Sequence, residues 1–192
     1  MRLLIGSLFA FAVAALVGLG STYFALSRGA AFGSLSIGSW TAWPKSGTAD
    51  ADPYARATIA RTGQLPMALG DGVSFSAQAD DKGRVLDGRC DVVVSGVTPA
   101  ARFWTLTLYN AAGELVANSV GRYGFTSEEI IRSADGSFTI TVAPRANPGN
   151  WLPTGGVERY GLVLRFYDTA IGVATRASRE VPMPAIKTRD CP

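Results

Sequence analysis

The chain has 192 residues, a formal net charge of +3, 17% charged residues and no histidine. This length suits one domain with its own core better than two. The lack of histidine excludes Ser-His and Cys-His nucleophile systems, histidine general bases and histidine-ligated metals. Charges of both signs are scattered along the chain, so the clustered basic surface of a nucleic-acid-binding protein is not expected.

The N-terminal stretch differs from the rest of the chain, because residues 3–26 carry no charge and are mostly apolar. Their number reaches the roughly 20 residues that a membrane-spanning helix needs. The apolar region of a cleaved signal peptide has only about 7–15 residues. We therefore predict that residues 1–28 form a transmembrane anchor that contacts the lipid bilayer through residues 3–26. A signal peptide cleaved near Ala25-Leu26-Ser27 is the alternative.

The orientation of this anchor does not follow from its flanking charges, since Arg2 lies on one side and Arg28 and Lys45 lie on the other. The short N-terminal tail favours a C-terminal domain outside the cytoplasm. The cysteine pair described next favours the same side. We expect a single-pass protein of the bacterial inner membrane with its C-terminal domain in the periplasm.

The two cysteines are Cys90 and Cys191. In an oxidising compartment an isolated pair predicts one disulfide. Closing a loop of this length stabilises a fold by roughly 4–5 kcal/mol in the chain-entropy model. The bond would also fix a C-terminal tail that has no other evident reason to be ordered. Two unrelated free thiols are the alternative.

Residues 29–48 are rich in glycine, serine and aromatic residues. This composition predicts a linker that includes a possible edge strand, before a folded domain over residues 49–192. Trp40 and Trp43 suit either the membrane interface, where tryptophan is enriched, or packing on the domain.

One short helix is expected in the domain, over residues 53–62. Asp52 is a good N-cap, and Pro53 fits the first helical position because its missing N–H would have no helical partner. The simplest interpretation is a helix that packs on or beside a sheet. The alternative makes Tyr54 and Arg56 a pair that faces a ligand.

The rest of the domain has the pattern of short strands and turns. The strongest strands are Ala101–Asn110 and Tyr160–Asp168, where apolar residues alternate with polar or aromatic ones. About eight strands are expected, without the alternation of strands and helices typical of parallel sheets. We predict an all-β fold, a two-layer antiparallel sandwich of jelly-roll type. Asp80-Asp81-Lys82-Gly83 is expected to be a turn rather than a calcium loop, because it lacks the spaced oxygen ligands.

Five short stretches carry a family resemblance. They are Asp52–Ala57 (DPYARA), Ala101–Leu106 (ARFWTL), Asp135–Ser137 (DGS), Asn150–Pro153 (NWLP) and Leu164–Tyr167 (LRFY). Together they resemble a bacterial family known only as domain of unknown function family 1214, over about Trp40 to Cys191. The resemblance implies a jelly-roll-like β domain of the cell envelope, which in longer relatives is the C-terminal half of a two-domain protein. It implies no reaction, because the family has none assigned.

Two arginines, Arg102 and Arg165, lie within strands that otherwise carry core residues. An arginine in such a place is paired with a carboxylate, reaches the rim of the sheet or binds an anion. We expect structural ion pairs with Asp52 or Asp168. The alternative is a role in binding a carboxylate or a sugar.

A second group of candidates follows the first strong strand. We expect Asn118, Arg122 and Tyr123 to form a polar loop, and the alternative is that they line the mouth of a ligand site together with Trp151. The sequence has no Gly-x-Ser-x-Gly nucleophile turn, no phosphate-binding loop and no dinucleotide-binding glycine pattern. It therefore predicts no catalytic residue, no metal site and no cofactor.

Two functions from different classes are consistent with these observations. The first is a non-catalytic periplasmic module, anchored in the membrane, that binds a partner protein or an envelope glycan. The second is a carboxylate-based hydrolase of glycans, which needs two carboxyl groups roughly 5–10 Å apart across a cleft. Most aspartates fall in turns, which favours the first function, whereas convergence of Glu114, Glu158 or Asp168 in a pocket would favour the second.

Overall fold

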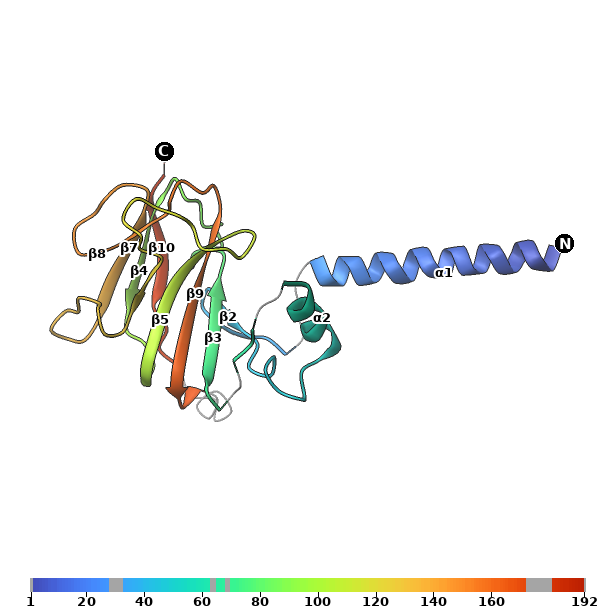
Figure 1. The fold of residues 1–192 in the computed structure, drawn as a ribbon, viewed down its shortest axis with the longest axis horizontal. Coiled ribbons are helices and arrows are strands. Elements are labelled where there is room, and N and C mark those ends of the chain that lie inside the picture. Colours follow the sequence, from blue (N-terminus) through green and yellow to red (C-terminus); the bar gives the residue numbers. More distant parts are fainter. Residues whose placement is uncertain (1, 28–32, 63–64, 68–69, 172–180, 192) are drawn as a thin grey trace.

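The computed structural model of the chain describes residues 2–27, 33–62, 65–67, 70–171 and 181–191. Their elements are mostly strands (Figure 1). In chain order they are α1 (Arg2–Ser27), β1 (Leu35–Ile37), β2 (Trp40–Ala42), α2 (Pro53–Thr62), β3 (Gly72–Ala77), β4 (Asp91–Gly96), β5 (Ala101–Asn110), β6 (Gly124–Thr126), β7 (Phe138–Ala143), β8 (Asn150–Pro153), β9 (Tyr160–Thr169) and β10 (Ala185–Asp190).

Helix α1 is the N-terminal apolar helix that the sequence predicts. Its side chains are exposed rather than packed on the body, with Leu3 88% and Phe11 76% exposed. Figure 1 shows the helix projecting away from the strands. By length and composition it is suited to be a membrane anchor or a signal sequence.

Strands β5 and β9 form the centre of a six-stranded sheet with the order β1-β2-β3-β9-β5-β6, in which all neighbours are antiparallel. Trp104, Leu106 and Leu108 of β5 are buried, and Leu106 lies opposite Leu164 of β9. The buried face predicted for β5 is therefore confirmed. Because side chains alternate along a strand, the residues between these positions lie together on the opposite face of the sheet.

The second sheet has four strands in the order β10-β4-β7-β8. Its β7–β8 pair is parallel, with Ile140 opposite Asn150, so the prediction of antiparallel pairing is wrong at this place. The reason is the buried side chain of Asn150, whose amide donates to the carbonyls of Ile131 at 2.8 Å and Thr139 at 2.9 Å. These bonds hold the start of β8 beside β7. The strand orders do not confirm the jelly-roll type, which stays a prediction.

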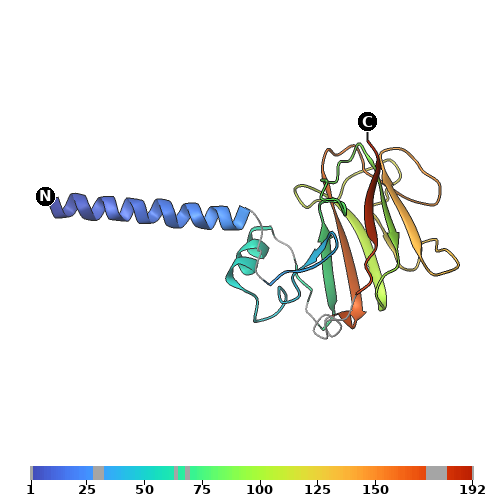
Figure 2. The ribbon, with the colours of Figure 1, turned by 180° about the vertical axis from the view of Figure 1, so that it is seen from behind.

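The two sheets pack against each other through their apolar faces, and Figures 1 and 2 show them one behind the other. Trp104 of β5 and Phe138 of β7 connect the layers, with ring centroids 5.2 Å apart. Each large apolar side chain buried here contributes roughly 1.5–3 kcal/mol to stability. The largest fully buried side chains are Trp40, Phe75, Phe138, Phe166, Leu86, Leu106, Leu108, Ile140, Leu152, Leu162, Leu164 and Ile186.

The segment before α2 belongs in part to the six-stranded sheet, because β1 and β2 form a hairpin that pairs with β3. Trp40 is 1% exposed, and its indole N–H donates to the carbonyl of Pro184 at 2.7 Å. Trp40 therefore packs on the body. Helix α2 spans the predicted residues and lies beside the β1–β2–β3 side of this sheet (Figures 1 and 2).

The turn at residues 80–83 is stabilised by the carboxylate of Asp80, which is 2% exposed. It accepts from the backbone N–H groups of Lys82 and Arg84, from the Arg84 Nε–H and from the hydroxyl of Thr188 on β10. The Arg84 Nη2 lies 2.7 Å from Asp80 Oδ2 as an ion pair. The predicted turn is therefore present, and its central carboxylate is fully used by donors of the chain.

The neighbouring side chains continue this attachment of β10. Asp81 accepts from the backbone N–H of Ile186 at 3.0 Å. Cys90, just before β4, forms a disulfide with Cys191, just after β10, across a sequence separation of 101 residues. The predicted disulfide is confirmed. We call Asp80, Asp81 and their partners, together with this disulfide, the β10 anchor.

Candidate functional site

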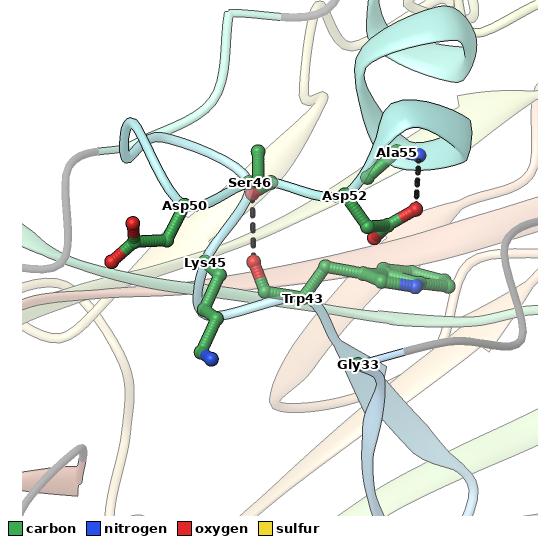
Figure 3. A pocket seen from close by; sticks show the side chains of 8 residues that line it. Gly33, Trp43, Lys45, Ser46, Asp50, Asp52 and Ala55 are labelled. Carbon is green, nitrogen blue, oxygen red and sulfur yellow. Dashed lines mark hydrogen bonds between the residues drawn. The ribbon is translucent and has the colours of Figure 1, made fainter.

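A small pocket of 140 Å³ lies between the β2–α2 connection and the first turn of α2. Asp52 accepts from the backbone N–H groups of Tyr54 and Ala55 at 2.9 and 3.0 Å, so its carboxylate is the N-cap of the helix. Figure 3 shows the side chains of Lys45 and Asp50 pointing away from each other. The pocket is lined by Gly33, Trp43, Lys45, Ser46, Asp50, Ala51, Asp52 and Ala55.

The predicted pair Tyr54 and Arg56 does not line this pocket. Arg56 donates from Nε to the carbonyl of Ala51 at 3.0 Å and from Nη2 to the carbonyl of Ala49. These bonds attach the β2–α2 connection to the helix. Tyr54 is 42% exposed. Of the side chains that line the pocket, Asp52 caps the helix and Ser46 donates to the carbonyl of Trp43 at 2.7 Å.

The group predicted after β5 is brought together, but by bonds within the chain. The Arg122 guanidinium donates to the carbonyl of Trp151 at 3.0 Å and lies 5.1 Å from the centroid of the Phe125 ring. Asn118 donates to the carbonyl of Arg122 and accepts from its backbone N–H, at 2.8 and 3.0 Å. Tyr123 is 40% exposed. These contacts brace a loop against β8.

A different surface, which we call the outer face, lies on the six-stranded sheet opposite the core. Each of its side chains is half-buried, because it is flanked by neighbours on the adjacent strands. One row across the sheet pairs Ser74 with Arg165 and Arg165 with Thr105. The outer face consists of Ser74 and Ser76 on β3, Phe103, Thr105, Thr107 and Tyr109 on β5, and Val163, Arg165 and Tyr167 on β9.

The only charge among these residues is on Arg165, whose guanidinium carbon lies 5.4 Å from the centroid of the Tyr109 ring. This distance lies within the range of a cation–π interaction. Within the described residues, Arg165 takes part in no salt bridge with Asp52 or Asp168, and Arg102, exposed near the start of β5, takes part in none either. The predicted structural pairing of these arginines is therefore wrong, because Asp52 caps α2 instead.

An aromatic pair lies beside Arg165 on the same surface. Phe103 and Tyr167 are opposite each other on β5 and β9, and their ring centroids are 5.8 Å apart at an interplanar angle of 44°. Tyr167 follows Arg165 by two residues, so the ring lies about 7 Å further along the strand. The outer face therefore combines aromatic rings, hydroxyl groups and one guanidinium on a sheet surface.

Sequence analysis missed Phe103, Tyr109 and Tyr167 as candidate site residues. The sequence did contain a sign of them. These aromatic residues alternate with the core residues of β5 and β9, so they occupy positions that face away from the core, where folding alone does not require an aromatic side chain. What the sequence does not contain is the register that places Tyr109 beside Arg165.

The three carboxylates considered for a glycan hydrolase do not all lie at one end of the sheet. Glu158 precedes β9 and Asp168 lies near its far end, so roughly 30 Å of strand separates them. Glu114 accepts from the side chain of Asn110 at 3.0 Å. These three side chains therefore do not form one site.

The shifted pKa values lie away from the outer face. Burial by itself raises the pKa of Asp80, but hydrogen bonds from its neighbours, first those of Arg84, outweigh it and hold the pKa well below the ordinary value. The hydrogen bond from the Arg89 side chain lowers the pKa of Asp87 to about 2. Burial raises the pKa of Tyr160. These shifts report packing and turn structure, so they mark no acid or base beside Arg165.

A comparison with curated proteins finds no match. Among solved structures, the VPA0106 protein from Vibrio parahaemolyticus is similar at 25% identity and a TM-score of 0.58, over 73% of this chain. An uncharacterised protein from Burkholderia cenocepacia is 15% identical, with a TM-score of 0.46 over 89% of this chain. The chain spans 36% and 40% of the lengths of these two proteins.

The profile of one family matches residues 71–171, more than half of the chain. The matched region runs from β3 to the end of β9 and includes the outer face. The family is described as a protein of unknown function, DUF1214, in agreement with the resemblance found from the sequence. The chain belongs to this family.

Proposed function

We propose that the protein is a non-catalytic module of the bacterial envelope, anchored in the inner membrane by α1, that binds a glycan through the outer face. The exposed apolar length of α1 supports the anchor. The disulfide between Cys90 and Cys191 supports a body in the periplasm, because disulfides persist in oxidising compartments.

The composition of the outer face carries the proposal for a glycan. Its serine and threonine hydroxyls donate and accept hydrogen bonds, as sugar hydroxyls do. Its aromatic rings present apolar surface with polar tips, which suits the mixed apolar and polar faces of a sugar ring. The small pocket beside α2 offers less, since its Asp52 is engaged as a helix cap.

A partner protein is the competing occupant of this surface. A protein interface of standard size buries about 800 Å² on each partner and is centred on a desolvated cluster of anchors. On the outer face the aromatic rings are half-buried, and the residues Thr105 and Thr107 of β5 separate the Phe103–Tyr167 pair from Tyr109. This arrangement favours a ligand that is itself rich in hydroxyls.

The proposal of a non-catalytic role rests on the positions of the acidic residues. Asp168 and Glu158 are separated by the length of β9, and the Glu114 carboxylate is hydrogen-bonded to Asn110. No observation favours the hydrolase over the binding module.

The location is tested by fusing alkaline phosphatase, which is active only outside the cytoplasm, to the C-terminus of the full chain. We expect an active fusion that stays in the membrane at its uncleaved size. An inactive fusion would contradict the periplasmic location. An active but soluble, shortened product would show a cleaved signal instead of an anchor.

The binding surface is tested with the full chain in lipid nanodiscs on an array of bacterial envelope glycans. We expect binding that the Phe103→Ala and Tyr167→Ala variants each weaken at least tenfold. Lys187→Ala, an exposed change on β10 of the other sheet, is the matched control. Equal binding by all variants would place the site elsewhere. Absence of glycan binding, with a photoreactive residue at position 107 cross-linking a defined membrane protein, would favour a protein partner.

A further inference from the structure

We infer that the glycan bound by the outer face carries carboxylate groups, and that Arg165 is the residue that binds them. This inference rests on the proposed function and specifies its ligand class.

Among the described residues, the guanidinium of Arg165 contacts the Tyr109 ring and donates no hydrogen bond. Its guanidinium lies over the Tyr109 ring, which favours a flat, stacked arrangement that leaves the N–H groups at the edge of the guanidinium. In the described part of the chain no carboxylate forms a salt bridge with it. A half-buried arginine in this state is pre-organised for an incoming acceptor.

The charges around Arg165 complement an anion. None of the outer-face residues is acidic, and the flanking side chains in its row are the hydroxyls of Ser74 and Thr105. The acidic residues lie toward the ends of the strands rather than in this row: Asp168 follows Tyr167 on β9, Asp71 precedes β3, and Glu114 follows β5, where the Asn110 side chain donates to it. A carboxylate bound at Arg165 therefore meets one positive charge and, in its own row, only hydroxyl groups.

The number of positive charges decides between a carboxylate and a phosphate. The planar fork of an arginine matches both groups. A phosphate monoester carries about −1.5 to −2 charges near neutral pH, whereas the outer face supplies a single cation. A carboxylate carries one charge, and its two oxygens accept two N–H bonds from one guanidinium. The surface therefore fits a uronic-acid type of sugar better than a phosphorylated one.

The aromatic pair gives the position of the sugar ring. The Phe103–Tyr167 pair lies about 7 Å along the strands from the backbone of Arg165, on the side opposite Tyr109, over whose ring the guanidinium lies. A chain of sugars that stacks on this pair and continues along β5 and β9 toward Tyr109 brings the carboxylate of a following sugar to the guanidinium. Stacking then supplies affinity for the chain of sugars, and Arg165 supplies the preference for acidic ones.

The test compares two probes that differ only in charge, an oligogalacturonide and the same oligosaccharide after reduction of its carboxyl groups. Binding of each to the full chain in nanodiscs of uncharged lipid is measured by calorimetry. We expect the acidic probe to bind at least tenfold more tightly than the reduced one. Arg165→Gln should abolish this difference by weakening the acidic probe alone, and Lys187→Gln is the control for loss of one positive charge.

The outcomes separate this inference from the proposed function. Equal affinity for both probes, unchanged in Arg165→Gln, would overturn the acidic ligand class and leave glycan binding in place. Binding of neither probe would overturn glycan binding itself. Arg165→Lys keeps the charge but lacks the fork, so we expect it to recover only part of the preference. The melting temperature of each variant, measured in parallel, shows whether a lost preference is a loss of folding.

Discussion

The β10 anchor and the outer face both place a charged side chain within the folded body, but they use it in opposite ways. In the β10 anchor, Asp80 is buried and accepts hydrogen bonds from Arg84, Lys82 and Thr188. On the outer face, Arg165 contacts the ring of Tyr109 and forms no salt bridge among the described residues. The fold depends on the first charge, whereas we propose that the second binds a ligand.

The difference shows how a structural charge is distinguished from a candidate binding charge in this chain. A charge that is buried must have all its hydrogen bonds made by the protein, since an unpaired buried charge is costly. A half-buried guanidinium tolerates unused donors because water reaches it. The same contrast predicts that changes in the β10 anchor affect stability first, and that changes at Arg165 affect binding first.

The largest expected effect on stability is the loss of the disulfide. Cys191→Ser should lower the free energy of unfolding by about 2–5 kcal/mol, because the unfolded chain loses a cross-link that closes a long loop. Urea unfolding of the variant, beside the oxidised and the reduced wild-type protein, measures this. The reduced wild type should match the variant. An unchanged unfolding midpoint would show that the bond contributes nothing to the fold.

A somewhat smaller effect is expected when Asp80 is replaced. Asp80→Ala should lower the free energy of unfolding by about 2–4 kcal/mol, because it leaves buried N–H and O–H donors without an acceptor and Arg84 without its partner. Denaturant unfolding at neutral pH is the measurement. Asp50→Ala, an exposed carboxylate in the β2–α2 connection, is the matched control and should change little. Equal effects of the two substitutions would show that the buried carboxylate of Asp80 contributes no more to stability than the exposed one of Asp50.

The same carboxylate predicts how stability depends on pH. The pKa of Asp80 is lower in the folded than in the unfolded protein, mainly because hydrogen bonds from Arg84 outweigh the effect of burial. Its contribution is therefore complete above the unfolded pKa of about 3.9 and is lost as the pH falls through and below that value. Asp87, whose pKa is lowered to about 2 by Arg89, changes stability in the same direction.

Urea midpoints measured from neutral pH downward test this dependence. We expect a nearly constant midpoint down to about pH 5 and a steep decrease below about pH 4. Asp80→Asn should make this decrease shallower, because the variant has no carboxylate to protonate at this position. A decrease of the same steepness in the variant would assign the acid sensitivity to other groups.

The smallest effect on stability is expected at Arg165. Arg165→Met keeps a long apolar side chain beside Tyr109 and loses a cation–π contact of about 0.5–1 kcal/mol. Arg84→Met should cost more, since it leaves the buried carboxylate of Asp80 without its ionic partner. Thermal unfolding of both variants gives the comparison. A larger loss in Arg165→Met than in Arg84→Met would show that Arg165 is a structural residue.

Much of the fold was predictable from local patterns. The apolar length of α1, the Asp52 cap of α2 and the alternation in β5 and β9 each depend on residues close together in the chain. The disulfide followed from having only two cysteines. These predictions hold because the residues that determine each feature lie within one helix or strand or, for the disulfide, in one pair of cysteines.

The parallel β8 and the state of Arg165 were not predictable in the same way. β8 depends on the Asn150 amide, which bonds to Ile131 and Thr139 from other segments. The sequence places Arg165 on a strand, but only the register of β5 against β9 decides that its neighbours are Thr105 and, further along, Tyr109. Side-chain partners across strands are a tertiary property, so a local pattern does not contain them.

The position of β10 has a consequence for the newly made chain. β4 pairs with β7 on one side and with β10 on the other, and the cysteines beside them are 101 residues apart. Until β10 is synthesised, one edge of β4, with its run of valines Val92–Val94, exposes unpaired N–H and C=O groups that another chain is able to join. Once it is made, β10 covers this edge of β4, and the disulfide between Cys90 and Cys191 holds the strand there.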